Sequence, residues 1–118
     1  MSDLLAALRG VLTTGDIVHG DDATSRLAGV WRSDLIKARI IVRPTSTAEV
    51  SAVMKLCHQR GQRVVVHGGL TGLVHAADTS PDDVVISTER LNRIEDLDKL
   101  GRTMTVQAGV PLQLIHEA

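Results

Sequence analysis

The residues best suited to binding chemistry in this chain are three glycines directly behind an apolar run. The stretch HGGLTG, residues 67–72, follows three valines and contains no lysine. Successive backbone N–H groups in such a loop can curl into a concavity that binds an anion, and the Thr71 hydroxyl can donate one more hydrogen bond. Glycine also permits the positive φ angles that such a curl uses. We therefore expect an uncharged cradle that could hold a pyrophosphate.

Two common phosphate-binding motifs do not fit this loop. The G-G-x-x-G spacing differs from the dinucleotide fingerprint, and residues 73–83 do not open a clear helix behind it. No lysine follows Gly72, as a P-loop requires. A structural alternative also exists, because glycines after a strand often form only a tight turn or let two backbones pack closely. From the glycines alone, both interpretations stay open.

The other chemically capable side chains do not form a catalytic set. The five histidines have no metal-ligand spacing with one another or with the single cysteine, Cys57. We expect solvated or packing roles for His19, His58, His75 and His116, and no metal site. Cys57 falls on the apolar stripe of a predicted helix, which favours a small core residue over a nucleophile. No catalytic residue is expected.

Four further residues allow two interpretations each. His67 either hydrogen-bonds a phosphate or turns to solvent. Asp82 and Asp83 could act as paired carboxylates, but their position after a proline favours a solvated turn. Trp31 is the only aromatic residue. We expect it to anchor its loop rather than to stack on a cofactor ring.

A strand, a helix and a second strand must position the glycine loop. Ser46 and Glu49 have the spacing of a capping box, in which each side chain satisfies a backbone donor of the helix terminus. Apolar residues at positions 50, 53, 54 and 57 then predict a helix over 47–60 that ends at Gly61. The β-branched runs 39–44 and 62–69 predict strands on either side. The helix between them allows these strands to lie parallel, with a right-handed crossover.

The remaining elements follow from weaker patterns. Helical spacing predicts a helix over 3–12, and residues 16–38 are interpreted as a loop with one helical turn. A further strand is predicted over 83–88, and extended segments over 93–98 and 102–108 around a hairpin turn at 99–101. A last helix begins at Pro111. The fold class is α/β (α+β).

Composition narrows the class of protein. The chain has 118 residues, a net charge of −1 and 43% hydrophobic residues, which is typical of soluble globular proteins. Balanced charge argues against a nucleic-acid partner, and nothing approaches the roughly 20 apolar residues of a membrane span. A lone cysteine favours a reducing compartment, so we expect a cytoplasmic protein.

Three segments in order carry a family resemblance. They are RPTSTAEVSAVMKLCHQRGQRVVVHGGLTGL (43–73), VVISTERLNRI (84–94) and TMTVQAGVPLQLI (103–115). Together they resemble the N-terminal half of the PCMH-type FAD-binding domain of the vanillyl-alcohol oxidase flavoprotein superfamily. Within it, they are most similar to the branch that contains D-2-hydroxyglutarate dehydrogenase, D-lactate dehydrogenase and the glycolate oxidase FAD subunit. The resemblance runs from about Val30 to the last residue.

The resemblance implies a set of FAD contacts. In this family the loop that matches Val66 to Val74 wraps the FAD pyrophosphate through backbone amides, and the proline that matches Pro44 lies on the adenine side. Ser87, Leu91 and Asn92 match a segment near the flavin, and Gly109 and Val110 match a turn at the next strand's end. The implied cofactor-binding residues are His67, Gly68, Gly69, Leu70, Thr71, Gly72, Leu73, Pro44, Ser87, Asn92, Gly109 and Val110.

The chain also departs from the family pattern. His75 and Ala76 stand where the family loop has two more glycines, and the proline expected near Thr79 comes later in the chain. Leu70 stands where members with covalently attached flavin have histidine. The resemblance therefore implies noncovalent FAD.

The family's activity is hydride transfer from a 2-hydroxy carbon to flavin N5. The second half of the flavin domain and the cap domain, which supplies the substrate clamp and the base, would follow residue 118. We therefore expect an N-terminal helix and loop (1–29) and a truncated FAD-binding module (30–118). This module would have no turnover alone, and a second chain could complete its flavin site. The apolar faces that the missing half would cover would be exposed and would favour self-association. The alternative is a noncatalytic α/β domain that no longer binds FAD and acts through protein contacts.

Overall fold

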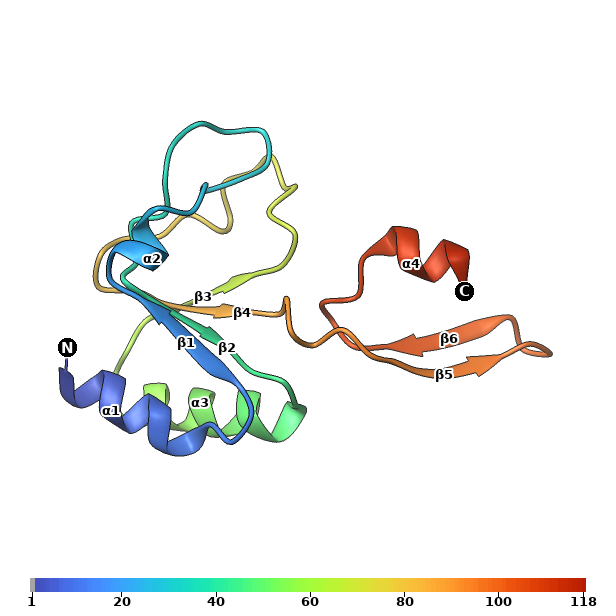
Figure 1. The fold of residues 1–118 in the computed structure, drawn as a ribbon, viewed down its shortest axis with the longest axis horizontal. Coiled ribbons are helices and arrows are strands. Elements are labelled where there is room, and N and C mark those ends of the chain that lie inside the picture. The colour runs from blue at the N-terminus through green and yellow to red at the C-terminus, as the bar shows by residue number, and fades with distance from the viewer. Residues whose placement is uncertain (1) are drawn as a thin grey trace.

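The computed structural model describes residues 2–118 as a four-stranded sheet with flanking helices, followed by a hairpin and a short helix (Figure 1). The helices are α1 (Ser2–Val11), α2 (Asp21–Thr24), α3 (Thr47–Gln59) and α4 (Leu112–Glu117). The strands are β1 (Asp16–His19), β2 (Ile40–Arg43), β3 (Val64–His67), β4 (Val84–Ser87), β5 (Ile94–Asp98) and β6 (Thr103–Val106). The mixed α/β class is confirmed, and the predicted bounds agree with the observed ones to within two residues for every predicted strand and for the helices α1 and α3.

The four-stranded sheet has the order β1-β2-β4-β3. Strands β2 and β3 are both parallel to β4, which lies between them, so the predicted parallel relation is confirmed. Strand β1 is antiparallel to β2, and its residues were expected in a loop. That expectation was wrong because a four-residue edge strand, DIVH, is too short to show a period of two, and its place comes from pairing with β2.

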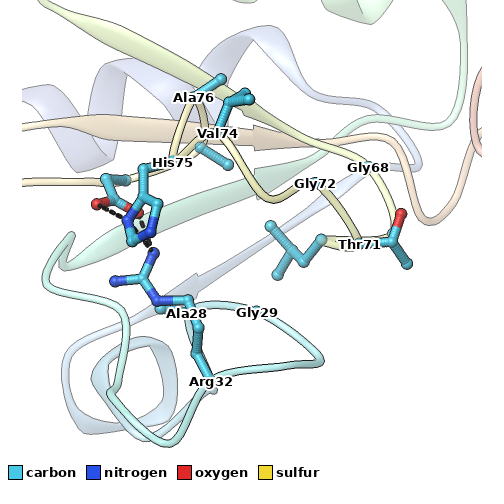
Figure 2. Close-up of a pocket in the computed structure, with 13 residues that line it drawn as sticks. Ala28, Gly29, Arg32, Gly68, Thr71, Gly72, Val74, His75 and Ala76 are labelled. Atoms are coloured by element: carbon cyan, nitrogen blue, oxygen red, sulfur yellow. Dashed lines mark hydrogen bonds and ion pairs between the residues drawn. The ribbon is translucent and has the colours of Figure 1, made fainter.

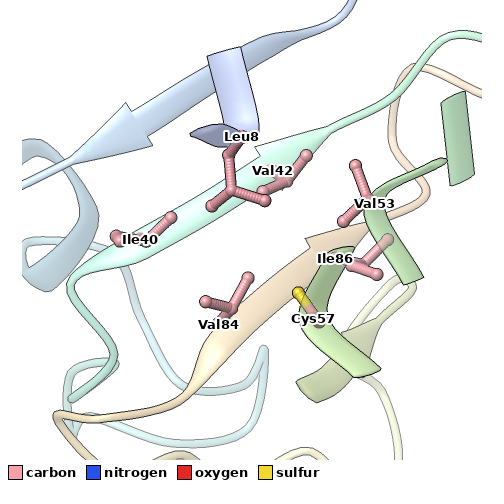
Figure 3. Packing of buried hydrophobic residues seen from close by; sticks show 7 residues of the cluster. All are labelled: Leu8, Ile40, Val42, Val53, Cys57, Val84 and Ile86. Carbon is pink, nitrogen blue, oxygen red and sulfur yellow. The ribbon is translucent and has the colours of Figure 1, made fainter. Parts of the chain in front are cut away.

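The central strands are buried on both faces. Alternate residues of β2 and β4 face α1 and α3, where Leu8, Val53 and Cys57 close the main core (Figure 3). The residues between them, Ile41 and Val85, face a second cluster formed with the segment 23–38. Strands covered on both sides read as continuous apolar runs, which is why these were predictable from sequence. Cys57 is 1% exposed, as expected of a core residue.

Helix α3 begins with half of the predicted capping box. Ser46 Oγ accepts a hydrogen bond from the Glu49 amide at 3.2 Å, as expected. The Glu49 carboxylate does not return to the Ser46 amide but binds Thr45 and the turn at residues 13–15. The capping box involves only neighbouring residues of the helix terminus. The buried Glu49 carboxylate instead accepts hydrogen bonds from a turn more than thirty residues away in sequence. Gly61 adopts φ 62° directly after the helix, as the C-terminal signal predicted.

Strands β5 and β6 form a separate antiparallel hairpin beside the main body (Figure 1). Every residue of β5 is exposed, and Leu97 of β5 and Leu112 of α4 present apolar side chains to solvent. Exposed apolar faces were expected from the family resemblance, although no position in the chain was predicted for them. Across residues 2–118, the helices are too short or too polar to cross a membrane.

Candidate functional site

The glycine loop, residues 68–77, lies at the carboxyl edge of the parallel strands, directly after β3. His67 closes its base, since Nε2 lies 2.8 Å from the carbonyl oxygen of Ala77. The ring is 3% exposed, so it does not turn to solvent. His67 therefore joins the two ends of the loop, a role that neither sequence interpretation included.

The backbone amides of the loop are free. Among the hydrogen bonds of residues 2–118, none is donated by an N–H group of residues 68–77. Backbone donors are strong, obligatory hydrogen-bonding groups, and most of those removed from water find a partner. A run of unpartnered amides at an exposed edge is therefore available to an acceptor from outside the chain.

The loop glycines do not adopt the positive φ angles that the sequence predicted for them. The positive φ angles fall on Leu70 (58°) and His75 (61°), and none of Gly68, Gly69 and Gly72 has one. The expectation that glycine supplies the positive φ angles was wrong, because external contacts hold two other residues in that region.

Close packing within the chain does not explain the glycines either. A Cβ on Gly68 or Gly69 would meet nothing nearer than 4.0 Å, and one on Gly72 would meet nothing within 4 Å. The tight-turn and close-packing alternatives therefore do not account for these glycines among the described residues. Because glycine has no side chain, the backbone at these three positions is left uncovered.

Two concave surfaces use the glycine loop as a shared wall. The first, of about 270 Å³, lies between the loop and the segment 28–32, and we call it the Arg32 pocket (Figure 2). Arg32 extends from that segment toward His75 at one end of the loop. Gly68, Thr71 and Gly72 line the same pocket.

The second concavity, of about 700 Å³, separates the glycine loop from the hairpin and α4, and we call it the hairpin groove. Gly68, Gly69 and Thr71 line one side of it. Asn92, Gly109, Val110 and Leu112 are among the residues on the other. Three sequence segments that were predicted separately therefore meet around one groove.

Gly109 has a clear packing role in this groove. A Cβ there would lie 1.8 Å from the carbonyl oxygen of Thr88 and 2.8 Å from that of Leu91. The Gly109 amide donates to the same Leu91 oxygen at 2.8 Å. Gly109 thus joins the start of the hairpin to its end, whereas the loop glycines contact nothing comparable.

Besides His67, three predicted site residues lie away from both concavities. Pro44 is less than 2% exposed and contacts the position a Cβ of Gly15 would take. Ser87 is 5% exposed, and its hydroxyl donates to Glu89 at 3.0 Å beside a third hollow lined by His67, Gly68 and Leu70. Leu73 is 76% exposed and lines neither the Arg32 pocket nor the hairpin groove.

Sequence reasoning missed Arg32 and Asp78, which form an ion pair across the Arg32 pocket. Arg32 also pairs with Asp34, and these carboxylates raise its pKa through hydrogen bonds, Asp34 first and Asp78 second. The pKa of Asp78 is lowered in turn by hydrogen bonds from Arg32 and then from His75. No spacing in the sequence signals this contact, since Arg32 and Asp78 are brought together by the fold.

Two side chains outside these concavities differ from expectation. Asp83 was expected in a solvated turn, but it is 2% exposed and accepts a hydrogen bond from the Ser80 amide at 2.8 Å. Its position just before β4 draws it into the structure, where Arg63 Nε lies 3.2 Å away. Trp31 was expected to anchor its loop, but its side chain is 74% exposed and so packs little against the rest of the chain. Within residues 2–118, no three metal-ligating side chains gather into a site.

Comparison with known protein families identifies the family to which this fold belongs. A family model described as "FAD binding domain" matches residues 38–118. The chain therefore belongs to this family of FAD-binding domains, in agreement with the PCMH-type resemblance of its sequence.

Similar proteins support the same family. D-2-hydroxyglutarate dehydrogenase of Xanthomonas citri pv. viticola is 36% identical over 119 residues, which cover 100% of this chain and 24% of that protein. D-lactate dehydrogenase of Anaerostipes hadrus is 41% identical over 83% of this chain and 20% of that protein. The structure of p-cresol methylhydroxylase aligns with a TM-score of 0.80 at 16% identity, over 98% of this chain and 24% of that one, which shows the fold. The chain thus spans about a quarter or less of these proteins.

Proposed function

We propose that this chain binds FAD noncovalently, with the pyrophosphate in the cradle formed by the glycine loop. The chain would be the pyrophosphate-binding part of an oxidoreductase that acts on a 2-hydroxy acid. Its sequence relatives carry the names D-2-hydroxyglutarate dehydrogenase and D-lactate dehydrogenase, which supports this substrate class. When bound, FAD supplies the hydride acceptor at flavin N5.

The observation that carries this proposal is the combination of free amides and uncovered glycines. Residues 68–77 donate no amide hydrogen bond within the described chain, and Cβ atoms on Gly68, Gly69 and Gly72 would meet nothing nearer than 4.0 Å. A pyrophosphate needs several donors at close range and no side chain in between. Amides without an internal partner and glycines without a covering side chain support this assignment, and the Thr71 hydroxyl adds a further donor on the wall shared by the two concavities.

Leu70 supports noncovalent attachment. Its side chain carries no nucleophilic atom, and it stands at the position where covalently flavinylated relatives have histidine. The nearby histidine, His67, is buried and bonded to Ala77. We expect FAD to be released when the protein is denatured.

We further propose that the chain has no turnover alone. The charged groups around the Arg32 pocket are already paired, Arg32 with Asp34 and Asp78, and Glu89 beside the third hollow is paired with Arg26. None of these groups is free to act as both substrate clamp and base. A segment or second chain that completes the flavin site would supply these functions.

The test is a titration of the purified protein with FAD, followed by flavin fluorescence and by emission of Trp31, the only aromatic residue. Thermal melting provides a second readout, since a ligand that binds the folded state raises the melting temperature. Riboflavin lacks the pyrophosphate and should bind much more weakly than FAD. FAD and riboflavin binding with equal affinity would contradict a pyrophosphate cradle.

Gly69→Val should abolish FAD binding while leaving the fold intact, because the new Cβ meets no atom nearer than 4.0 Å and its side chain would stand over the proposed cradle. Gly10→Val is the matched control, since a Cβ at Gly10 meets nothing within 4 Å and Gly10 lies in α1, away from the loop. Absence of FAD binding by a folded wild-type protein would favour the noncatalytic domain instead. The observation in favour of that second function is His75, which holds a positive φ where the family has glycine.

A further inference from the structure

The segment 28–34 contacts the glycine loop at both of its bends. The Val30 amide donates to the carbonyl oxygen of Leu70 at 3.1 Å. Farther along, Arg32 Nη1 lies 3.1 Å from Nδ1 of His75 and pairs with Asp78. Leu70 and His75 are the two loop residues with positive φ.

The contacts from segment 28–34 are made at the two loop residues with positive φ, Leu70 and His75. Positive φ is unfavourable for residues other than glycine and persists only when the surroundings hold it. The loop amides make no internal hydrogen bonds, so the loop does not determine its own shape. Apart from the His67 bond at its base, the polar contacts that hold its bends come from the segment 28–34 and from Asp78, whose amide donates to the His75 carbonyl oxygen at 3.2 Å.

The ion pairs of Arg32 form a clasp, which we define as Arg32, Asp34, Asp78 and His75 (Figure 2 shows Arg32 and His75). Arg32 Nε donates to Asp34 Oδ1 at 2.8 Å, and its Nη2 bonds the other Asp34 oxygen. Nη1 is thereby directed to Asp78, whose second oxygen lies 3.1 Å from Nδ1 of His75. Asp34 thus orients Arg32, and Arg32 holds the far end of the loop.

We propose that Arg32 and Asp78 are positioning residues that hold the glycine loop in its FAD-binding shape before FAD arrives, so that they set FAD affinity without contacting FAD. This inference rests on the proposed function. Ordering a loop in advance removes part of the entropy cost of binding, which increases affinity without a new contact. We assign Arg32 a positioning role rather than that of a phosphate counter-ion, because its Nε, Nη1 and Nη2 each already donate to a carboxylate.

The test compares Arg32→Gln, Asp78→Asn and the double variant by FAD titration and thermal melting. Each single substitution should raise the Kd for FAD by roughly three- to tenfold, as expected for loss of one exposed ion pair that also orders a loop. The double variant should be no worse than either single one, because both remove the same contact. The melting temperature without FAD should stay the same, which separates positioning from general stability.

Two further variants sharpen this comparison. Arg32→Lys keeps the charge and should recover part of the lost affinity. Arg39→Gln is the matched control, since Arg39 is exposed and its side chain makes no hydrogen bond or ion pair among residues 2–118. It removes the same charge and should leave the Kd unchanged.

A ligand-free readout keeps the inference separate from the proposed function. Leu73 and Val74 are 76% and 84% exposed, and thermolysin cleaves before such residues when a loop is mobile. Cleavage there should be several-fold faster in Arg32→Gln and Asp78→Asn than in the wild type or in Arg39→Gln. If the wild type binds no FAD, the proposed function fails, and unchanged cleavage would show that the clasp does not order the loop either.

The sign of the Asp78→Asn effect decides between two roles for Arg32. Weaker FAD binding supports the clasp. Tighter FAD binding would mean that Asp78 competes with the phosphates for Arg32, which would overturn the proposal. Unchanged affinity in Arg32→Gln, with FAD bound normally by the wild type, would overturn it as well.

Discussion

Replacing Glu49 with glutamine should destabilise the protein strongly. The side chain is 4% exposed and its carboxylate accepts six hydrogen bonds, four on Oε2 and two on Oε1. The Oε2 donors are the amides of Thr13, Thr14 and Gly15 and the Thr13 hydroxyl, and the Oε1 donors are the amide and hydroxyl of Thr45. Glu49 therefore ties the turn before β1 to the start of α3.

The magnitude follows from this geometry. Glutamine retains one acceptor oxygen and places an NH2 group against donors on the other side, so at least one backbone amide loses its acceptor. A buried unsatisfied donor costs about 1–3 kcal/mol, and the bonds that remain lose their charge assistance. We expect Glu49→Gln to lower the free energy of unfolding by about 2–4 kcal/mol at neutral pH, a large part of the roughly 5–15 kcal/mol of a typical domain.

The Glu49 carboxylate should also make the stability of the protein depend on pH. Burial alone would raise the pKa of Glu49, but hydrogen bonds from Thr45, Thr13 and Gly15 outweigh it and hold the pKa far below the ordinary 4.5. Below about pH 4.5 the unfolded chain takes up a proton that the folded chain does not, so the stability supplied by Glu49 is present above this pH and is lost as pH falls. In Glu49→Gln this part of the acid dependence should be absent.

Urea unfolding at pH 7 and pH 4, followed by circular dichroism, measures both effects. Glu95→Gln is the control, because Glu95 is exposed on β5 and makes no side-chain hydrogen bond among the described residues. A Glu49→Gln protein within about 0.5 kcal/mol of the wild type, the range of ordinary surface substitutions, would refute the reasoning. An unchanged loss of stability between pH 7 and pH 4 would refute the assignment of the acid dependence.

Further outcomes follow from burial and packing. Gly109→Ala should lower the melting temperature clearly, because a Cβ would overlap the Thr88 carbonyl oxygen, whereas a melt like that of the wild type would show that the hairpin can move away. Cys57 is 1% exposed and burial raises its pKa, so a thiol reagent should label it slowly in the native protein and fully in urea. Exposed apolar side chains such as Ile94 and Leu97 should cause concentration-dependent self-association in sedimentation, and a single monomeric species would contradict this.

Local patterns were sufficient for most elements. The capping serine and the apolar spacing of α3 act within one helix, so its start and end could be predicted from neighbouring residues. Strands β2 and β4 are buried on both faces and read as continuous β-branched runs. Strand β1 carries no such signal, because its place depends on pairing with β2.

In the candidate site too, some features could be predicted from the sequence and others could not. The sequence by itself determined that Gly68, Gly69 and Gly72 follow a strand and that a pyrophosphate cradle was one interpretation. Only the tertiary structure decided against turn and packing roles, because φ angles and the space around a Cβ are properties of the folded backbone. Contacts between residues far apart in sequence, such as Arg32 with Asp78 and Glu49 with Thr13, have no local spacing to read and arise when the chain folds.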